Sequence, residues 1–267
     1  MKGLLVENLC VGYGRREVLK NISLKVAPGQ IVAVLGENGC GKTTLLRAIG
    51  GTVSVSSGRI LVDETDLSGC RPRRRAAYLA TMPQICAAEV GVTGMDRVEM
   101  SFFPDKGLFG RLTQVEREAI LAMAQELNMT DLLSRDLSQM SAGERQMIFL
   151  LAAAVRGTPV LLLDEPSSAL DFNRTEEMFA LLHRLAERGS AILTVLHDPT
   201  QALRHASAIL RLDGNGAERI DLTDPDYEVV QRSLRRLYPH LKIHRDPLFC
   251  ISERETVKSE DSYHADH

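Results

Sequence analysis

Residues Gly36 to Thr44 read G-E-N-G-C-G-K-T-T and complete the G-x-x-x-x-G-K-T pattern of a phosphate-binding loop. Glycines let successive backbone N–H groups point into one concavity, and a helix that starts there adds its positive end. We expect Lys42 to reach the β- and γ-phosphates of a nucleotide and Thr43 to offer its hydroxyl to Mg²⁺. The residues predicted to hold the nucleotide in this loop are Gly36, Glu37, Asn38, Gly39, Cys40, Gly41, Lys42, Thr43 and Thr44.

Two carboxylates, Asp164 and Glu165, follow directly after the apolar run Val160 to Leu163. Such a run is typical of a central parallel strand, and ligands of open α/β sheets bind outside the carboxyl ends of the strands. We therefore expect Asp164 to hold Mg²⁺, directly or through water, and Glu165 to polarise an attacking water.

A second anion-binding feature lies in the stretch Gln139 to Gln146, where small residues precede a helix. A single triphosphate has no use for two such features from one chain. The stretch therefore predicts that two copies of the chain meet at each nucleotide.

The elements that must position these residues alternate between strands and helices. The phosphate loop lies between the apolar runs 31–35 and 45–49, which read as a buried strand and the start of a helix. Residues 3–27 alternate apolar and polar and predict an antiparallel hairpin or small sheet. Residues of about 88–157 show helical patterns without intervening strands. The pattern predicts a mostly parallel sheet with helices on both faces.

Composition excludes several other classes of protein. The 267 residues carry a net charge of −3, which gives no overall attraction to nucleic acid, and the basic run Arg71 to Arg75 reads as a solvated loop. The five cysteines form no C-x-x-C pair, which disfavours a zinc site or a disulfide framework and favours a reducing compartment. No apolar run reaches transmembrane length, so we expect a soluble chain whose membrane role needs a partner.

Residues 1 to about 213 resemble an ATP-binding-cassette (ABC) ATPase, whose signature motif reads L-S-G-G-Q. Met140, Ala142 and Glu144 replace the leucine, the first glycine and the glutamine of that motif, whereas Ser141 and Gly143 match it. The resemblance implies that Ser141 and Gly143 cap the nucleotide held by a partner chain.

Further family motifs follow in the expected order along the chain. Tyr13 matches the aromatic residue that stacks on adenine, and Gln84 matches the glutamine that senses Mg²⁺ and the attacking water. Asp171, in Ser168 to Asp171, matches the loop that crosses the dimer in the family, and His197 matches the switch histidine at the γ-phosphate. By this resemblance Glu165, His197 and Gln84 are catalytic residues, and Thr43, Gln84 and Asp164 are Mg²⁺ ligands.

The resemblance also implies a fold and a division of the chain. The expected fold is an α/β P-loop NTPase domain of ABC type, with a mostly parallel core sheet, an antiparallel N-terminal β-subdomain and an inserted helical subdomain. We expect this domain to span residues 1–213, with the helical insertion at about 88–157. Residues 214–267 are expected to form a small C-terminal extension with a frayed polar tail, with a helix that Asp224-Pro225 caps.

The single cassette resembles bacterial importers. Residues 96–111 and 237–247 resemble the coupling region and the C-terminal extension of the ATPases that serve iron-siderophore, haem and cobalamin uptake, although Ser101-Phe102 replaces a frequent Gly-Arg. The implied assembly is a homodimer bound to permease subunits at the cytoplasmic face of the inner membrane. It would act indirectly with a periplasmic or surface substrate-binding protein and without nucleic acid. A molybdate or other oxyanion importer, or a soluble ABC ATPase outside transport, is the alternative.

Overall fold

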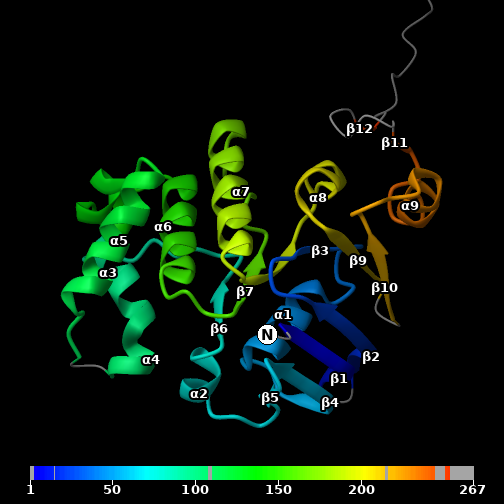
Figure 1. Ribbon diagram of the computed structural model, residues 1–267, viewed down its shortest axis with the longest axis horizontal. Helices are drawn as coiled ribbons and strands as arrows, with labels where there is room; N and C mark the ends of the chain where they lie inside the picture. Colours follow the sequence, from blue (N-terminus) through cyan, green and yellow to red (C-terminus); the bar gives the residue numbers. More distant parts are fainter. Residues whose placement is uncertain (1–2, 15, 108–109, 214–215, 244–249, 253–267) are drawn as a thin grey trace, which may run out of the picture. The chain divides into compact units, whose positions relative to one another are not determined.

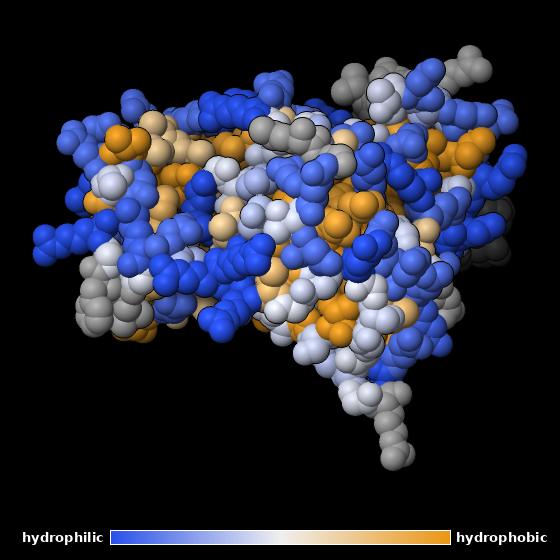
Figure 2. All heavy atoms as spheres, turned by 60° about the horizontal axis from the view of Figure 1, so that its bottom comes forward, coloured by the Kyte–Doolittle hydropathy of each residue, from blue (hydrophilic) through white to orange (hydrophobic). Residues whose placement is uncertain are grey.

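The computed structural model describes residues 3–14, 16–107, 110–213, 216–243 and 250–252 (Figure 1). The contacts divide the chain into two compact units, residues 1–223 and residues 224–267. Within the described residues, no helix is long and apolar enough to cross a membrane. The face seen in Figure 2 is mostly hydrophilic, and its apolar residues form separate groups.

The first unit is built on a six-stranded sheet with the strand order β10-β9-β3-β8-β7-β6. Its parallel strands are β3 (Ile31–Gly36), β6 (Leu79–Met82), β7 (Val160–Asp164), β8 (Ala191–Val195) and β9 (Ala208–Leu212). The edge strand β10 (Ala217–Asp221) pairs with β9 in the antiparallel sense. Because the central strands β3, β7 and β8 are covered on both faces, they read as continuous apolar runs.

A second, antiparallel sheet has the order β2-β1-β4-β5. It comprises β1 (Leu4–Tyr13), β2 (Arg16–Val26), β4 (Val55–Val62) and β5 (Thr65–Asp66). Helix α1 (Lys42–Gly50) contacts strands of both sheets, and its apolar side chains share one buried cluster with them. Contacts with both sheets therefore hold the start of α1, where the phosphate loop ends.

The helices between β6 and β7 gather at one end of this unit (left in Figure 1). They are α3 (Gly94–Glu99), α4 (Phe103–Lys106), α5 (Gln114–Glu126) and α6 (Ala142–Ala154), with 3₁₀ turns η1 (Met100–Phe102), η2 (Thr130–Ser134) and η3 (Leu137–Gln139). A capping box between Ser141 and Glu144 starts α6, and from Gln146 to its last residue this helix is buried. The remaining helices of the unit are α2 (Pro72–Ala76), α7 (Phe172–Glu187) and α8 (Pro199–His205).

The second unit contains α9 (Tyr227–Leu234) and the antiparallel pair β11 (Leu241–Ile243) and β12 (Cys250–Ser252). The predicted cap of α9 at Asp224-Pro225 is wrong. Asp226 caps this helix instead, because its carboxylate accepts hydrogen bonds from the backbone N–H groups of Glu228 and Val229.

The predicted α/β fold is confirmed, with its antiparallel N-terminal sheet, its mostly parallel core and its helices. The proposed domain boundaries, 1–213 with an insertion at about 88–157 and then 214–267, stay a prediction. Strand β10 lies beyond residue 213 and pairs with the core sheet. The predicted polar tail, residues 253–267, lies outside the described residues.

Candidate nucleotide-binding site

The phosphate loop occupies the turn between β3 and α1. Gly39 and Gly41 have φ values of +80° and +106°, in the left-handed region that favours glycine. A side chain at Gly41 would meet Leu19 of β2 at 2.6 Å, and one at Gly36 would meet the carbonyl oxygen of Leu212 at 2.5 Å. The loop thus needs glycine both for its turn and for its close packing on β2 and β9.

Lys42 and Cys40 both fold inward against this loop. The Lys42 ammonium donates hydrogen bonds to the carbonyl oxygens of Gly36 at 2.7 Å and Glu37 at 3.0 Å. The Lys42 side chain is buried, so its positive charge stays within the phosphate loop. Burial raises the pKa of the Cys40 thiol, against the opposing effect of Lys42. The raised pKa favours the uncharged thiol at this position of the loop.

Asp164 ends β7 next to the start of α1. The Thr43 hydroxyl donates to its carboxylate at 3.3 Å, which brings two predicted Mg²⁺ ligands together. Burial raises the pKa of Asp164, while the hydrogen bond from Thr43 and the charges of Arg47 and Lys42 act in the opposite direction. A divalent cation at this point would favour the charged carboxylate.

Glu165 is the centre of the predicted catalytic group. Gln84, after β6, donates from Nε2 to one Glu165 oxygen at 2.7 Å, and Nε2 of His197, after β8, lies 2.5 Å from the other. Glu165 itself has φ +53°, an unusual value for a residue with a side chain. The ends of three neighbouring parallel strands therefore place these three side chains in contact.

A cavity of about 420 Å³ opens in front of these groups. Its volume lies in the range of small-molecule sites. Val18 of β2 lines it although the sequence did not single this residue out, because an apolar residue in an alternating strand carries no sign of a ligand. The lining residues are Val18, Asn38, Gly39, Gly41, Lys42, Thr43, Thr44, Gln84, Glu165 and His197.

Seven predicted nucleotide contacts are not among the lining residues, namely Gly36, Glu37 and Cys40 of the phosphate loop and Tyr13, Ser141, Gly143 and Asp171 outside it. Tyr13, at the end of β1, is 49% exposed. Ser141 and Gly143 lie at the N-terminus of α6, and Asp171 caps α7 by accepting a hydrogen bond from the backbone of Arg174. Their roles stay predictions, and Ser141, Gly143 and Asp171 are the three for which a partner chain was expected.

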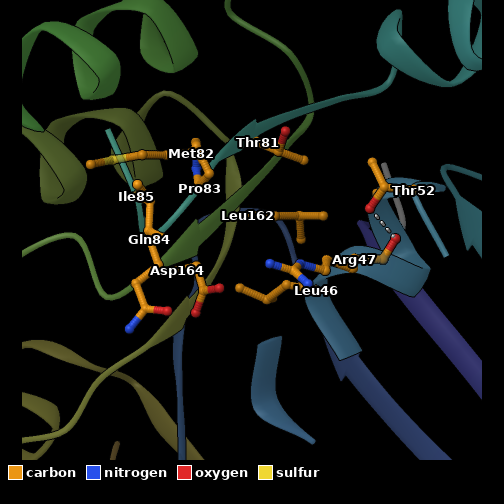
Figure 3. A pocket seen from close by; sticks show the side chains of 11 residues that line it. Leu46, Arg47, Thr52, Thr81, Met82, Pro83, Gln84, Ile85, Leu162 and Asp164 are labelled. Atoms are coloured by element: carbon orange, nitrogen blue, oxygen red, sulfur yellow. Dashed lines mark hydrogen bonds between the residues drawn. The ribbon is translucent and has the colours of Figure 1, made fainter. Parts of the chain in front are cut away.

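A second cavity, of about 330 Å³, lies behind Asp164 between α1, β6 and β7 (Figure 3). Leu46, Leu162 and Met82 make much of its wall, and the Arg47 side chain extends toward Asp164. Ile85, the residue after Gln84, lines its edge and is 79% exposed. Gln84 lines both cavities, so the group around Glu165 adjoins this second, mostly apolar cavity.

The sequence has clear relatives. A profile of the ABC transporter family matches residues 19–168, more than half of the chain. The iron(3+)-hydroxamate import ATP-binding protein of Bacillus subtilis (strain 168) is 32% identical over 79% of this chain and 79% of its own. A hemin import ATP-binding protein of Pseudomonas fluorescens (strain Pf0-1) is 34% identical over 88% of this chain and 92% of its own.

Solved structures show the same fold. One, described as an inward-facing conformation of a putative metal-chelate type ABC transporter, has a TM-score of 0.75 and 25% identity, covering 92% of this chain and 95% of its own. A dimeric bacterial ABC transporter cassette has a TM-score of 0.73 at 23% identity, covering 82% of this chain and 98% of its own, a likeness of fold alone.

Proposed function

Because this chain belongs to the ABC transporter family as an ATP-binding and ATP-hydrolysing subunit, we propose that it powers uptake of a metal chelate through a separate permease. The observation that carries the ATPase site is the meeting of Gln84, Glu165 and His197 beside the phosphate loop. The substrate class is supported by relatives named for iron-hydroxamate and hemin import. The cargo would be a siderophore, haem or cobalamin type of chelate.

In the proposed mechanism the phosphate loop binds the triphosphate. The Lys42 ammonium exchanges the carbonyl oxygens of Gly36 and Glu37 for phosphate oxygens, which are stronger partners because they carry charge. Backbone N–H groups at the start of α1 supply further donors. Phosphoryl transfer to water depends mostly on such positioning and charge stabilisation.

Glu165 takes the role of the base that orients and polarises the attacking water. Its two carboxylate oxygens already have Gln84 and His197 as partners, so a water must share or replace one of them. In this exchange His197 would turn to donate to the γ-phosphate. This exchange links activation of the water to the arrival of the phosphate.

The residues present fit a magnesium ion. The Thr43 hydroxyl and the Asp164 carboxylate lie 3.3 Å apart and are oxygen ligands, which Mg²⁺ prefers, and Gln84 lies at the same edge of the sheet. Thr43 and Asp164 would hold the ion, with Gln84 beside it. When bound, the ion would neutralise charge on the transferred phosphate.

We further propose a homodimer in which two chains meet head to tail. Ser141 and Gly143, at the N-terminus of α6, do not line the cavity of their own chain. A thirteen-residue helix that starts at an exposed serine is well suited to an anion from another chain. Each nucleotide would lie between the phosphate loop of one chain and α6 of its partner.

The permease is proposed to dock over the surface around Ile85. An exposed isoleucine at the mouth of an apolar cavity favours a protein contact (Figure 3). A neighbouring cavity of about 270 Å³ is lined by Arg97, Met100 and Ser101 of the predicted coupling region, and the buried Ser101 hydroxyl has no hydrogen-bond partner among the described residues. This docking would place the chain at the cytoplasmic face of the membrane.

A deletion strain tests the proposal. Growth on ferric siderophore, haem, cobalamin or molybdate as the limiting source is compared after complementation with the wild-type gene and with Glu165→Gln. We expect the wild-type gene alone to restore growth on one of the metal chelates. Restoration on molybdate would contradict the substrate class, and sedimentation with ribosomes or DNA without a membrane protein would contradict the transport role.

A further inference from the structure

Gln146 is a buried polar side chain that the mechanism above does not use. It lies on α6, one turn after Gly143, and only 2% of its surface is exposed. A polar group buried to this extent is expected to have defined hydrogen-bond partners. The partners of Gln146 lie on the segment that contains Glu165.

Three hydrogen bonds connect Gln146 to that segment. Its Nε2 donates to the carbonyl oxygen of Glu165 at 2.9 Å and to the Ser168 hydroxyl at 3.2 Å. Its Oε1 accepts from the backbone N–H of Ala169 at 2.9 Å. A carbonyl only accepts and a backbone N–H only donates, so these partners fix the orientation of the amide.

These hydrogen bonds hold the backbone at Glu165, which has an unfavourable conformation. Glu165 has φ +53°, which residues with side chains seldom adopt. Its backbone N–H donates to Val195 of β8, and its carbonyl oxygen accepts from both Ser168 and Gln146. Both peptide groups of Glu165 are thereby held, one by the core sheet and the other by α6.

Helix α6 also approaches the same segment through Gly143. A side chain at Gly143 would meet the carbonyl oxygen of Ala169 at 2.8 Å. Residues three apart lie on one face of a helix, so Gly143 and Gln146 form a single contact surface. A shift of α6 must therefore move the backbone that carries Glu165.

We propose that Gln146 is a positioning residue that ties the backbone of Glu165 to α6, so that an anion bound at the N-terminus of α6 tunes Glu165 in the same chain. The inference rests on the proposed head-to-tail dimer, in which that anion is the nucleotide held by the partner. Hydrolysis at one site would then depend on occupancy of the other through the hydrogen bonds of one side chain.

The test uses the full-length chain with Gln146→Met, which keeps the volume but loses all three bonds. ATP hydrolysis is measured against ATP concentration with Mg²⁺, ATP affinity by calorimetry, and folding by thermal melting. We expect kcat to fall about 10- to 100-fold, as for a displaced catalytic group, with ATP affinity within about twofold of the wild type. We expect a Hill coefficient above one for the wild type and of about one for Gln146→Met.

Gln146→Glu has nearly the same shape as the wild type and distinguishes the role of the donating Nε2 from that of the accepting Oε1. Its carboxylate still accepts from Ala169 but cannot donate to the Glu165 carbonyl. A buried carboxyl gains a proton readily, so its kcat relative to the wild type should rise as the pH is lowered from about 8 to about 6. Gln201→Met is the matched control, because Gln201 lies on α8 and accepts a hydrogen bond from Ser167 in the same segment. It should keep the wild-type kcat.

Wild-type kcat in Gln146→Met, or ATP affinity that falls in parallel with kcat, would overturn the inference. An unfolded Gln146→Met together with a Gln146→Glu variant whose pH profile matches the wild type would also overturn it, since the role would then be structural alone. The measurement needs only the chain, ATP and Mg²⁺, so its result is independent of the importer proposal. The dimer is tested separately by sedimentation of Glu165→Gln with ATP.

Discussion

The packing of the phosphate loop on β2 leads to a prediction for Gly41→Ala. The Cβ atom added at Gly41 would lie 2.6 Å from a methyl group of Leu19 and 3.2 Å from one of Val18. Leu19 is fully buried, so this methyl group cannot move aside into solvent. Gly39→Ala is the matched control, because Gly39 is also left-handed but has no atom within 4 Å of an added Cβ.

The two substitutions should lower the free energy of unfolding by different amounts. Both place a side chain in the left-handed region, at about 1–2 kcal/mol, partly offset by about 0.4–1 kcal/mol from a less flexible unfolded chain. Gly41→Ala adds overpacking against Leu19, at about 1–3 kcal/mol. At about 2–4 °C per kcal/mol for a domain of this size, its melting temperature should lie about 2–12 °C below that of Gly39→Ala.

Thermal melting followed by circular dichroism measures this difference, and calorimetry with ATP measures its effect on the site. We expect Gly41→Ala also to bind ATP more weakly than Gly39→Ala, because relief of the contact with Leu19 shifts the start of α1. Equal melting temperatures for the two variants would refute the argument that β2 supports the phosphate loop.

Glu165→Gln should retain ATP affinity but lose about 10²–10⁴-fold in kcat, because it removes the proposed base, and wild-type-like hydrolysis would contradict that role. Lys42→Ala should instead lose ATP affinity in calorimetry, and unchanged binding would contradict the phosphate-loop interpretation. Ile85→Asp should abolish co-purification of the permease while the isolated chain still hydrolyses ATP. Val115→Asp, which alters another exposed apolar residue, should leave both the co-purification and the ATP hydrolysis unchanged. Burial lowers the pKa of His205 from 6.5 to about 4, so the unfolded chain takes up that proton first as the pH falls. Stability should therefore drop by about 3 kcal/mol between about pH 6.5 and about pH 4, and His205→Phe should reduce that drop in urea unfolding. An equal drop in the variant would exclude His205 as its source.

Much of the fold and of the candidate site could be predicted because the signals are local. The phosphate loop is contiguous, and its turn, glycines and flanking apolar runs all lie within a short stretch. Asp164 and Glu165 were singled out in the same way, since they directly follow an apolar run that is typical of a buried parallel strand. Helix ends were less certain, as the cap of α9 at Asp226 shows, because neighbouring acidic residues compete for one position.

The sequence by itself determined that the chain has a phosphate loop, two acidic residues after a buried strand and a small-residue turn before a helix. Only the tertiary structure decided which of these meet. Gln84, Glu165 and His197 are far apart in the chain and come together because β6, β7 and β8 are parallel neighbours. The hydrogen bonds between Gln146 and the backbone at Glu165 and Ala169 could not be predicted from the sequence either. Strand order and close packing bring distant residues together, and no local pattern encodes that choice.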